Sequence, residues 1–124
     1  MNGMGADDQV AAEHTRSRCA LFQEALELVG RRWSAAILTA TADGPRRYSE
    51  YLTVIDGISD RLLAQRLKEL AEAGLVSRQV AATTPVQVRY TLTSSGRELV
   101  EAMAPLGTWG VKWLPAQNAS THNG

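Results

Sequence analysis

The chain has 124 residues, of which 44% are hydrophobic, and its formal net charge at pH 7 is zero. This length fits a single domain with a core of its own, and the balanced charge argues neither for nor against a nucleic-acid partner. The single cysteine, Cys19, excludes an intrachain disulfide and indicates a reducing, cytoplasmic setting. No apolar run approaches the length of a membrane span, which argues against a membrane partner.

Charge is distributed unevenly along the chain. Residues 31–89 contain nine basic and six acidic side chains, whereas residues 1–30 contain two basic and five acidic ones. The basic excess, although modest, therefore lies in the middle of the chain.

Residues 1–15 show no apolar periodicity and are predicted to form a disordered tail. A helical pattern begins near Cys19, with apolar residues at Leu21, Phe22, Ala25, Leu26 and Val29. Gly30 is placed to end this helix. Ser34 can then cap a second, apolar helix, and an Asp-Gly-Pro turn follows at residues 43–45.

The middle of the chain predicts a helix-turn-helix. Residues 48–55 form a short amphipathic pattern, and an Asp-Gly turn follows at residues 56 and 57. Ser59 is a good N-cap for a longer helix, and Asp60 places a negative charge at the positive end of the helix dipole. Apolar residues recur on one face of this helix, at Leu63, Leu67 and Leu70. A short helix, a tight turn and a capped helix make up the motif.

The face opposite these leucines is short and polar. It comprises Asp60, Arg61, Ala64, Gln65 and Lys68. Side chains of these types can contact base edges and phosphates, although a merely solvated helix face has the same composition. Arg61 and Gln65, one turn apart, are the best candidates for reading bases, and the surrounding elements favour this interpretation.

A β-hairpin is predicted directly after this helix. Gly74 is placed to end the helix, and residues 75–80 then change to the period of a strand. A loop at residues 81–85 leads to a second alternating strand at residues 86–92. A helix-turn-helix followed by a hairpin is a winged helix, so the predicted fold class is mainly α with a small β-hairpin (α+β).

Thr93 and Ser94 can cap a last helix. Its apolar residues recur at alternating spacings of four and three: Leu99, Met103, Leu106, Gly110 and Trp113. This pattern is closer to a coiled-coil seam than to the core of one domain. Pro105 and Gly107 interrupt it, which predicts a kink or a break. The polar residues 115–124 are predicted to be a second disordered tail, so the folded domain is expected to span residues 16–114.

The chain resembles an HxlR-type winged helix-turn-helix transcriptional regulator of bacteria, within the broader MarR-like group. The resemblance covers residues 19–113 in the order of that family. It is carried by Cys19, Ala25-Leu26-Glu27-Leu28-Val29-Gly30-Arg31-Arg32-Trp33, Ile37-Leu38, Gly44-Pro45-Arg46-Arg47-Tyr48-Ser49-Glu50, Gly57-Ile58-Ser59, Leu67-Lys68-Glu69-Leu70, Gly74-Leu75-Val76-Ser77-Arg78, Pro85, Val88-Arg89-Tyr90, Leu92-Thr93, Gly96 and Trp109-Gly110.

The resemblance implies a homodimer that acts as a repressor and inserts two central helices into successive major grooves of a pseudo-palindromic, double-stranded DNA site. The N- and C-terminal helices would form the dimer interface, through Leu21, Phe22, Leu26, Leu99, Met103, Leu106, Trp109 and Trp113. No cofactor is implied. The full set of predicted DNA-contacting residues is Arg46, Arg47, Ser49, Ser59, Asp60, Arg61, Ala64, Gln65, Lys68, Gln87 and Arg89.

The signal that controls such a regulator is left open between oxidation and a small molecule. In the family, a cysteine near the start of the first helix serves some members as a redox switch, but Cys19 could equally be a packed structural residue. The alternative is an aromatic or apolar effector held between two chains by Phe22, Trp33, Met103 and Trp109.

Other functions are less well supported by the sequence. His14 and His122 lie near the ends of the chain, far from Cys19, so no metal site is predicted. No catalytic constellation is evident, and the protein is predicted not to be an enzyme. A winged-helix module for protein–protein contact without specific DNA binding is the alternative, because the wing tip at residues 81–85 carries no basic residue.

Overall fold

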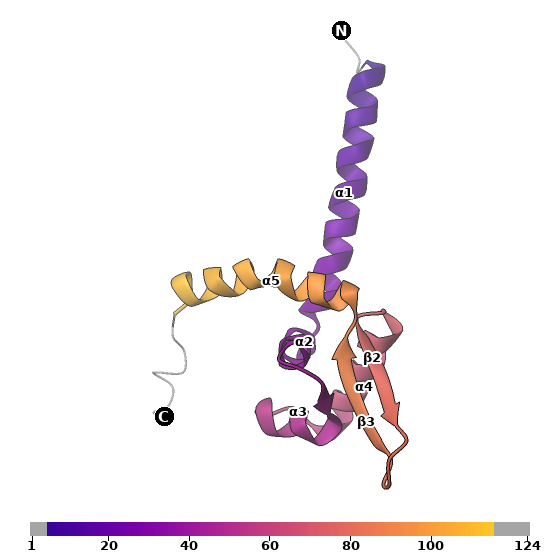
Figure 1. Ribbon diagram of the computed structural model, residues 1–124. Helices are drawn as coiled ribbons and strands as arrows, with labels where there is room; N and C mark the ends of the chain where they lie inside the picture. The colour runs from indigo at the N-terminus through magenta and orange to yellow at the C-terminus, as the bar shows by residue number, and fades with distance from the viewer. Residues whose placement is uncertain (1–4, 116–124) are drawn as a thin grey trace. The chain divides into compact units, whose positions relative to one another are not determined.

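The computed structural model describes residues 5–115 of the chain (Figure 1). Its elements in order are α1 (Ala6–Gly30), α2 (Ser34–Ala42), β1 (Arg46–Arg47), α3 (Tyr48–Val54), α4 (Asp60–Glu72), β2 (Val76–Ala81), β3 (Gln87–Leu92) and α5 (Ser94–Trp113). The chain divides into two compact units between Ala35 and Ala36, and each is described by itself. The predicted fold class is confirmed: the protein is mainly helical, with a small antiparallel sheet and a winged helix-turn-helix.

The first unit consists mainly of α1. This helix begins at Ala6, ten residues before residue 16, where the folded domain was expected to begin. The prediction of a disordered tail is therefore wrong for residues 6–15, whereas residues 1–4 lie outside the described residues. Alanines favour the helix, and Asp7 and Asp8 lie in its first turn, where the helix dipole attracts negative charge. The apolar pattern that predicted the helix begins only near Cys19, and residues 6–15 have no such pattern, so the sequence did not indicate the first part of α1.

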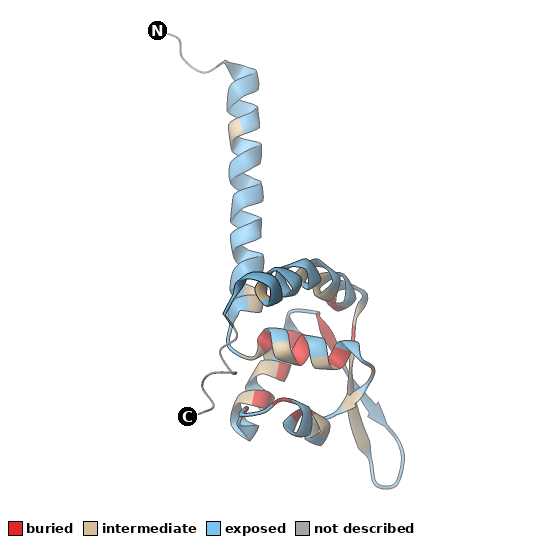
Figure 2. Cartoon of the chain, turned by 90° about the vertical axis from the view of Figure 1, so that its left-hand side faces the viewer, coloured by how far each residue is buried: buried red, intermediate tan, exposed pale blue. Residues whose placement is uncertain are grey.

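The core of the second unit forms around the leucine face of α4 (Figure 2). Its buried apolar side chains come from α2, α3, α4, the turn between α3 and α4, the hairpin strands and the residue before β2. They are Ile37, Leu38, Tyr51, Ile55, Ile58, Leu63, Leu67, Leu70, Leu75, Val76 and Leu92. This core fixes one face of α4 and leaves the other face to solvent.

The sheet has three antiparallel strands in the order β1-β3-β2. β2 pairs with β3 along its whole length, and the two residues of β1 pair on the other side, Arg46 opposite Tyr90 and Arg47 opposite Arg89. The sequence did not predict β1, because two residues are too few to show a period of two. This short strand ties the start of α3 to the wing.

A kink or a break was predicted in the last helix. The break is wrong, since α5 runs unbroken from Ser94 to Trp113 with Pro105 inside it, and the kink stays a prediction. A proline removes one helical hydrogen bond, here the bond to the carbonyl of Glu101. Glu101 is exposed, so water can satisfy that carbonyl. Of the predicted tail at residues 115–124, only Pro115 is described, and it lies outside regular structure.

Candidate nucleic-acid interface

α4 is held at both ends by the features that the sequence predicts. The backbone amide of Leu62 donates to Oγ of Ser59 at 3.1 Å, so Ser59 is the N-cap. At the other end Gly74 has φ +78°, and the amide of Leu75 donates to the carbonyl of Leu70 at 2.9 Å. Gly57, with φ +88°, forms the turn before the helix. The helix-turn-helix is therefore set by local capping as well as by its buried leucines.

The outer face of α4 is exposed at each of its predicted positions: Asp60, Arg61, Ala64, Gln65 and Lys68. Among the described residues, neither Arg61 nor Lys68 has an ion pair or a side-chain hydrogen bond, so both charges are available to a partner. Gln65 is partly engaged, because its Nε2 donates to Oε2 of Glu69 at 3.2 Å. Arg61, Gln65 and Lys68 follow one another at helical spacing on the same surface.

The two arginines of β1 differ in their exposure and in the groups that their guanidinium groups contact. Arg46 is half-buried, donates from Nε to the carbonyl of Ala40 at 2.7 Å and lies 3.6 Å from a carboxylate oxygen of Asp43. Arg47 is exposed, and its guanidinium lies 3.8 Å from Glu50. The pKa of Glu50 is held below its ordinary value, first by the hydrogen bond from the amide of Arg47 and then by the nearby arginines. Of the two, Arg47 is the more accessible to phosphate.

Ser49 and Ser59 are both exposed, at the starts of α3 and α4. Ser59 accepts the capping bond with its oxygen, which leaves its hydroxyl proton for a partner. The wing residues Gln87 and Arg89 are half-buried in β3. Arg89 stands directly opposite Arg47, and like charges in such a pair repel unless an anion lies near them. This pairing depends on β1, a strand that the sequence did not predict.

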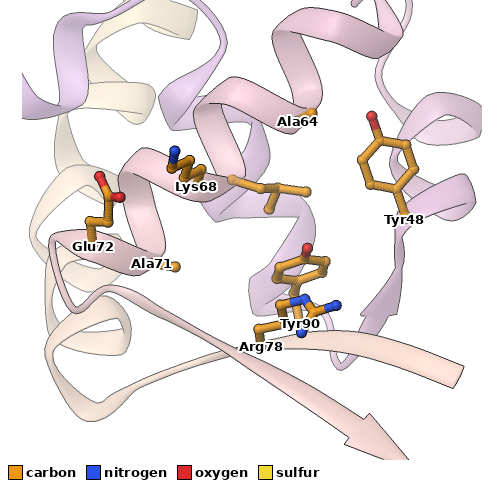
Figure 3. Close-up of a pocket in the computed structure, with 8 residues that line it drawn as sticks. Tyr48, Ala64, Lys68, Ala71, Glu72, Arg78 and Tyr90 are labelled. Carbon is orange, nitrogen blue, oxygen red and sulfur yellow. The ribbon is translucent and has the colours of Figure 1, made fainter.

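A groove that the sequence did not predict runs between α4 and the hairpin (Figure 3), with a volume of about 440 Å³. It is lined by Tyr48, Ala64, Leu67, Lys68, Ala71, Glu72, Arg78 and Tyr90. Tyr48 donates from its hydroxyl to the carbonyl of Asp60 at 2.6 Å, and burial, followed by the proximity of Asp60, raises its pKa. Strand alternation is the one signal that could have placed Arg78 and Tyr90 in a site, since they face each other across β2 and β3.

Cys19 lies in the middle of α1 rather than near its start, so the helix terminus does not act on its thiol. It is exposed and shares a shallow hollow with Thr15, Arg18 and Phe22. The structure thus brings two of the predicted signal-sensing residues together on one helix. Within residues 5–115, no group of three or more metal-ligating side chains could hold an ion.

The other predicted effector residues are not gathered within either unit. Trp33 belongs to the first unit, where it has an unusual positive φ of 79° and the guanidinium of Arg32 lies 4.9 Å from its ring centroid. Met103 is half-buried and Trp109 exposed, both on α5 of the second unit.

Most of the predicted interface side chains are exposed in the described chain. On α1 these are Leu21, Phe22 and Leu26, and on α5 they are Leu106, Trp109 and Trp113. Leu99 and Met103 are half-buried. None of the described helices combines the length and the apolar character needed to span a membrane.

A capped helix with an exposed polar face, preceded by a short helix and followed by a β-hairpin, defines a winged helix-turn-helix protein. The family model of the HxlR-like helix-turn-helix matches residues 28–118, and the chain belongs to this family. It is a DNA-binding transcriptional regulator, as the resemblance in the sequence implied.

Two relatives illustrate this membership. The HTH-type transcriptional regulator YodB from Bacillus subtilis is 41% identical over 91 residues, which cover 73% of this chain and 81% of YodB. The structure of the reduced form of YodB has a TM-score of 0.69 at 39% identity, covering 74% of this chain and 90% of that one. The redox regulator HypR in its oxidized form has a TM-score of 0.71 at 28% identity, covering 77% of this chain and 98% of that one.

Proposed function

We propose that the protein is a repressor that binds a pseudo-palindromic DNA site as a homodimer and that oxidation of Cys19 controls it. The observation that carries the DNA-binding part is the outer face of α4, where Arg61 and Lys68 are exposed without partners among the described residues. In this proposal α4 enters the major groove, and Arg61 and Gln65 reach base edges. Gln65 exchanges its weak bond to Glu69 for an adenine edge.

The basic pair beside the helix supports contact with the DNA backbone. Arg47 and Arg89 are cross-strand neighbours, and Glu50 lies against Arg47. Glu50 already supplies one anion beside this pair, and a phosphate would add a second acceptor for charge-assisted hydrogen bonds from the two guanidinium groups. Arg46 contributes less in this proposal, because its guanidinium is already engaged by Ala40 and Asp43.

The homodimer is supported by the exposed apolar side chains of both long helices. Trp109 and Trp113 on α5 are 52% and 63% exposed, and Phe22 on α1 is 65% exposed. A single winged helix also buries too little area on DNA to be both tight and specific, so two half-sites are the usual arrangement. Light scattering at micromolar concentration should therefore give twice the mass of the chain, and the mass of a monomer would contradict the dimer.

The decisive experiment is binding to a fragment from the intergenic region upstream of the protein's own gene, followed by footprinting. A regulator that neutralises six to ten phosphates should lose affinity by a factor on the order of 10³ or more between 50 and 200 mM salt. A scrambled fragment of equal length and composition is the control. A protected palindrome on the first fragment and none on the second is the expected result.

The alternative function is a protein–protein interaction module. The observation that favours it is the wing tip, where Val80 and Val86 are more than half exposed and residues 81–85 contain no charge. Equal and weak binding to both DNA fragments at low salt would support this alternative and overturn the repressor.

The control step rests on the position of Cys19. An exposed thiol can be reached by oxidants, and the similarity to the redox regulator HypR favours oxidation over an effector. In the simplest step the Cys19 thiols of two chains lose two protons and two electrons to an oxidant such as a peroxide or a quinone, and a disulfide forms between them. A mixed disulfide between Cys19 and a small thiol is the other route. The aromatic effector remains the competing signal.

A further inference from the structure

We propose that the groove between α4 and the β2–β3 hairpin seats the sugar–phosphate backbone of the bound DNA, and that Lys68 and Arg78 hold one phosphate there from opposite walls. This inference rests on the proposed function, in which α4 enters the major groove. It adds Arg78 as a DNA contact that the helix-turn-helix motif alone does not assign. The groove lies entirely within the second unit.

The groove lies where a DNA backbone has to pass if α4 enters the major groove. An α-helix with its side chains is about 10–12 Å wide and the major groove is about 12 Å wide, so the flanks of the helix face the two backbones. Ala64 and Lys68 line the groove and also belong to the exposed outer face of α4. The groove therefore continues the proposed base-contacting face on the side of the hairpin.

The charges of the groove suit one phosphate. Lys68 comes from α4 and Arg78 from the hairpin, and they are the two basic lining residues (Figure 3). Among the described residues, neither has an ion pair or a side-chain hydrogen bond, so both can bind an anion. The planar fork of an arginine matches the geometry of a phosphate. Glu72, the last residue of α4, repels a phosphate from that end of the groove.

The floor of the groove suits the sugars of the backbone. Leu67 is buried beneath it, and Ala64 and Ala71 keep the surface of α4 low on either side. A DNA backbone alternates charged phosphates with largely apolar deoxyriboses. An apolar floor beside two cations therefore fits a stretch of this backbone better than a free inorganic anion.

The walls of the groove are ordered before DNA arrives. Tyr48 is fixed by the 2.6 Å hydrogen bond from its hydroxyl to the carbonyl of Asp60. Tyr90 meets the buried ring of Tyr51 edge to face, with centroids 6.2 Å apart and an interplanar angle of 71°. Arg78 stands beside Tyr90, its partner across the strands. A site whose walls are already ordered loses little conformational entropy on binding.

The groove is separate from the basic pair formed by Arg47 and Arg89. Paired residues of neighbouring strands point to the same face of a sheet, and consecutive residues of one strand point to opposite faces. Arg78 and Tyr90 are paired and share the face toward α4, whereas Arg89, next to Tyr90, points to the other face together with Arg47. Substitution of Arg78 therefore removes one contact without disturbing that pair.

The test is the salt dependence of binding by the full chain to the upstream fragment and to its scrambled control. A phosphate contact carries no sequence information, so Arg78→Gln should weaken binding to both fragments about tenfold at low salt. The slope of log K against log salt should become shallower by about 0.9 for each bound chain. Arg78→Lys keeps the charge and should restore the slope.

Arg16→Gln is the matched control, because it removes the same charge from an exposed position on α1 and should leave the slope unchanged. Circular dichroism checks that the variants are folded, and Lys68→Gln tests the opposite wall of the groove. Replacing single phosphates by uncharged methylphosphonates then locates the contact. At one linkage in each half-site, the replacement should weaken binding by wild type about tenfold and leave binding by Arg78→Gln unaffected.

Three outcomes would overturn the inference: an unchanged slope in Arg78→Gln, an equal change of slope in Arg16→Gln, or no linkage whose replacement separates wild type from Arg78→Gln. In each of these cases wild type still binds DNA, so the proposed function stands. If wild type binds neither fragment, the proposed function fails and the inference fails with it.

Discussion

The hydroxyl oxygens of Thr41 and Tyr51 lie 2.5 Å apart inside the second unit, where the Tyr51 side chain is completely buried. The direction of this hydrogen bond follows from a third group. Thr41 donates its only hydroxyl proton to the carbonyl of Ile37 at 2.8 Å, so Tyr51 must be the donor between the two hydroxyls. The pair ties α3 to α2 beneath the helix-turn-helix.

This direction predicts unequal effects of two conservative substitutions. Tyr51→Phe removes the donor and leaves Thr41 satisfied by its own bond, so the free energy of unfolding should fall by about 0.5–1.5 kcal/mol. Thr41→Val leaves the Tyr51 hydroxyl buried without an acceptor and should cost about 1–3 kcal/mol. Urea unfolding at pH 7 measures both. A larger loss in Tyr51→Phe than in Thr41→Val would show that the direction is reversed.

Stability should also depend on alkaline pH through Tyr51. Burial raises its pKa in the folded chain above the ordinary value of about 10. Below that value the phenol is neutral in both states, and its contribution is fully present. As the pH rises further, the unfolded chain releases the proton first, so folding loses this contribution until the folded pKa is passed. The stability difference between wild type and Tyr51→Phe should shrink between pH 7 and pH 10.5, and an unchanged difference would contradict the shift.

Gly96 joins α5 to the hairpin at a distance that only glycine allows. A Cβ atom there would lie 2.1 Å from the carbonyl oxygen of Leu75, which already accepts a hydrogen bond from the amide of Thr93 at 3.0 Å. Gly96→Ala must therefore push α5 away from the sheet, and it should cost about 1–3 kcal/mol of unfolding free energy. Gly107→Ala in the same helix has nothing within 4 Å and should be neutral or stabilising by about 0.5–1 kcal/mol. Equal losses in the two variants would refute the close contact.

What the sequence could predict was local. The capping by Ser59, the leucine stripe and the glycine that ends α4 are signals within a few residues of one another, and all three are confirmed. The period of two similarly predicted the hairpin. Two predictions about helices failed, one where the sequence has no apolar pattern and one where the fold tolerates a residue that usually ends a helix. The first ten residues of α1 have no apolar pattern, and α5 continues past a proline that usually breaks a helix.

The candidate site was less predictable than the fold. The leucines of α4 were expected to be buried, which leaves the opposite face of the helix to solvent, and this face is exposed in the structure. The groove and the pairing of Arg47 with Arg89 depend on strand register across about forty residues of sequence, which no local pattern encodes. Arg46, which is half-buried, lies opposite Tyr90 in the same pair of strands. Which of these residues contact DNA stays a prediction.

Two substitutions can distinguish a base contact by Arg61 from a contact with the phosphate backbone. Arg61→Ala should weaken binding to the footprinted site by about 1–3 kcal/mol and weaken binding to scrambled DNA much less, since a bidentate contact to guanine is lost. Lys68→Ala is the control on the same helix face, and as a phosphate contact it should weaken both fragments alike. Competition binding at fixed salt measures the two ratios. If Arg61→Ala also weakens both fragments equally, Arg61 contacts phosphate rather than bases.

The same binding assay can decide what role Cys19 has. Its exposure and its position in the hollow with Arg18 and Phe22 leave it open to reagents, whereas a structural cysteine would be packed. Two-chain crosslinking and a mixed disulfide differ in mass, so non-reducing electrophoresis and mass spectrometry distinguish the two products.

Cys19→Ser should therefore bind the footprinted site as tightly as reduced wild type, because the substitution changes one exposed atom far from α4 in sequence. After treatment with a mild thiol oxidant, wild type should lose at least tenfold in affinity and regain it with a reductant, whereas Cys19→Ser should be unaffected. The reversal matters, since oxidation of Met103 would not be undone by a thiol reductant. If wild type and Cys19→Ser respond alike to the oxidant, Cys19 is not the sensor and an aromatic effector becomes the better account of control.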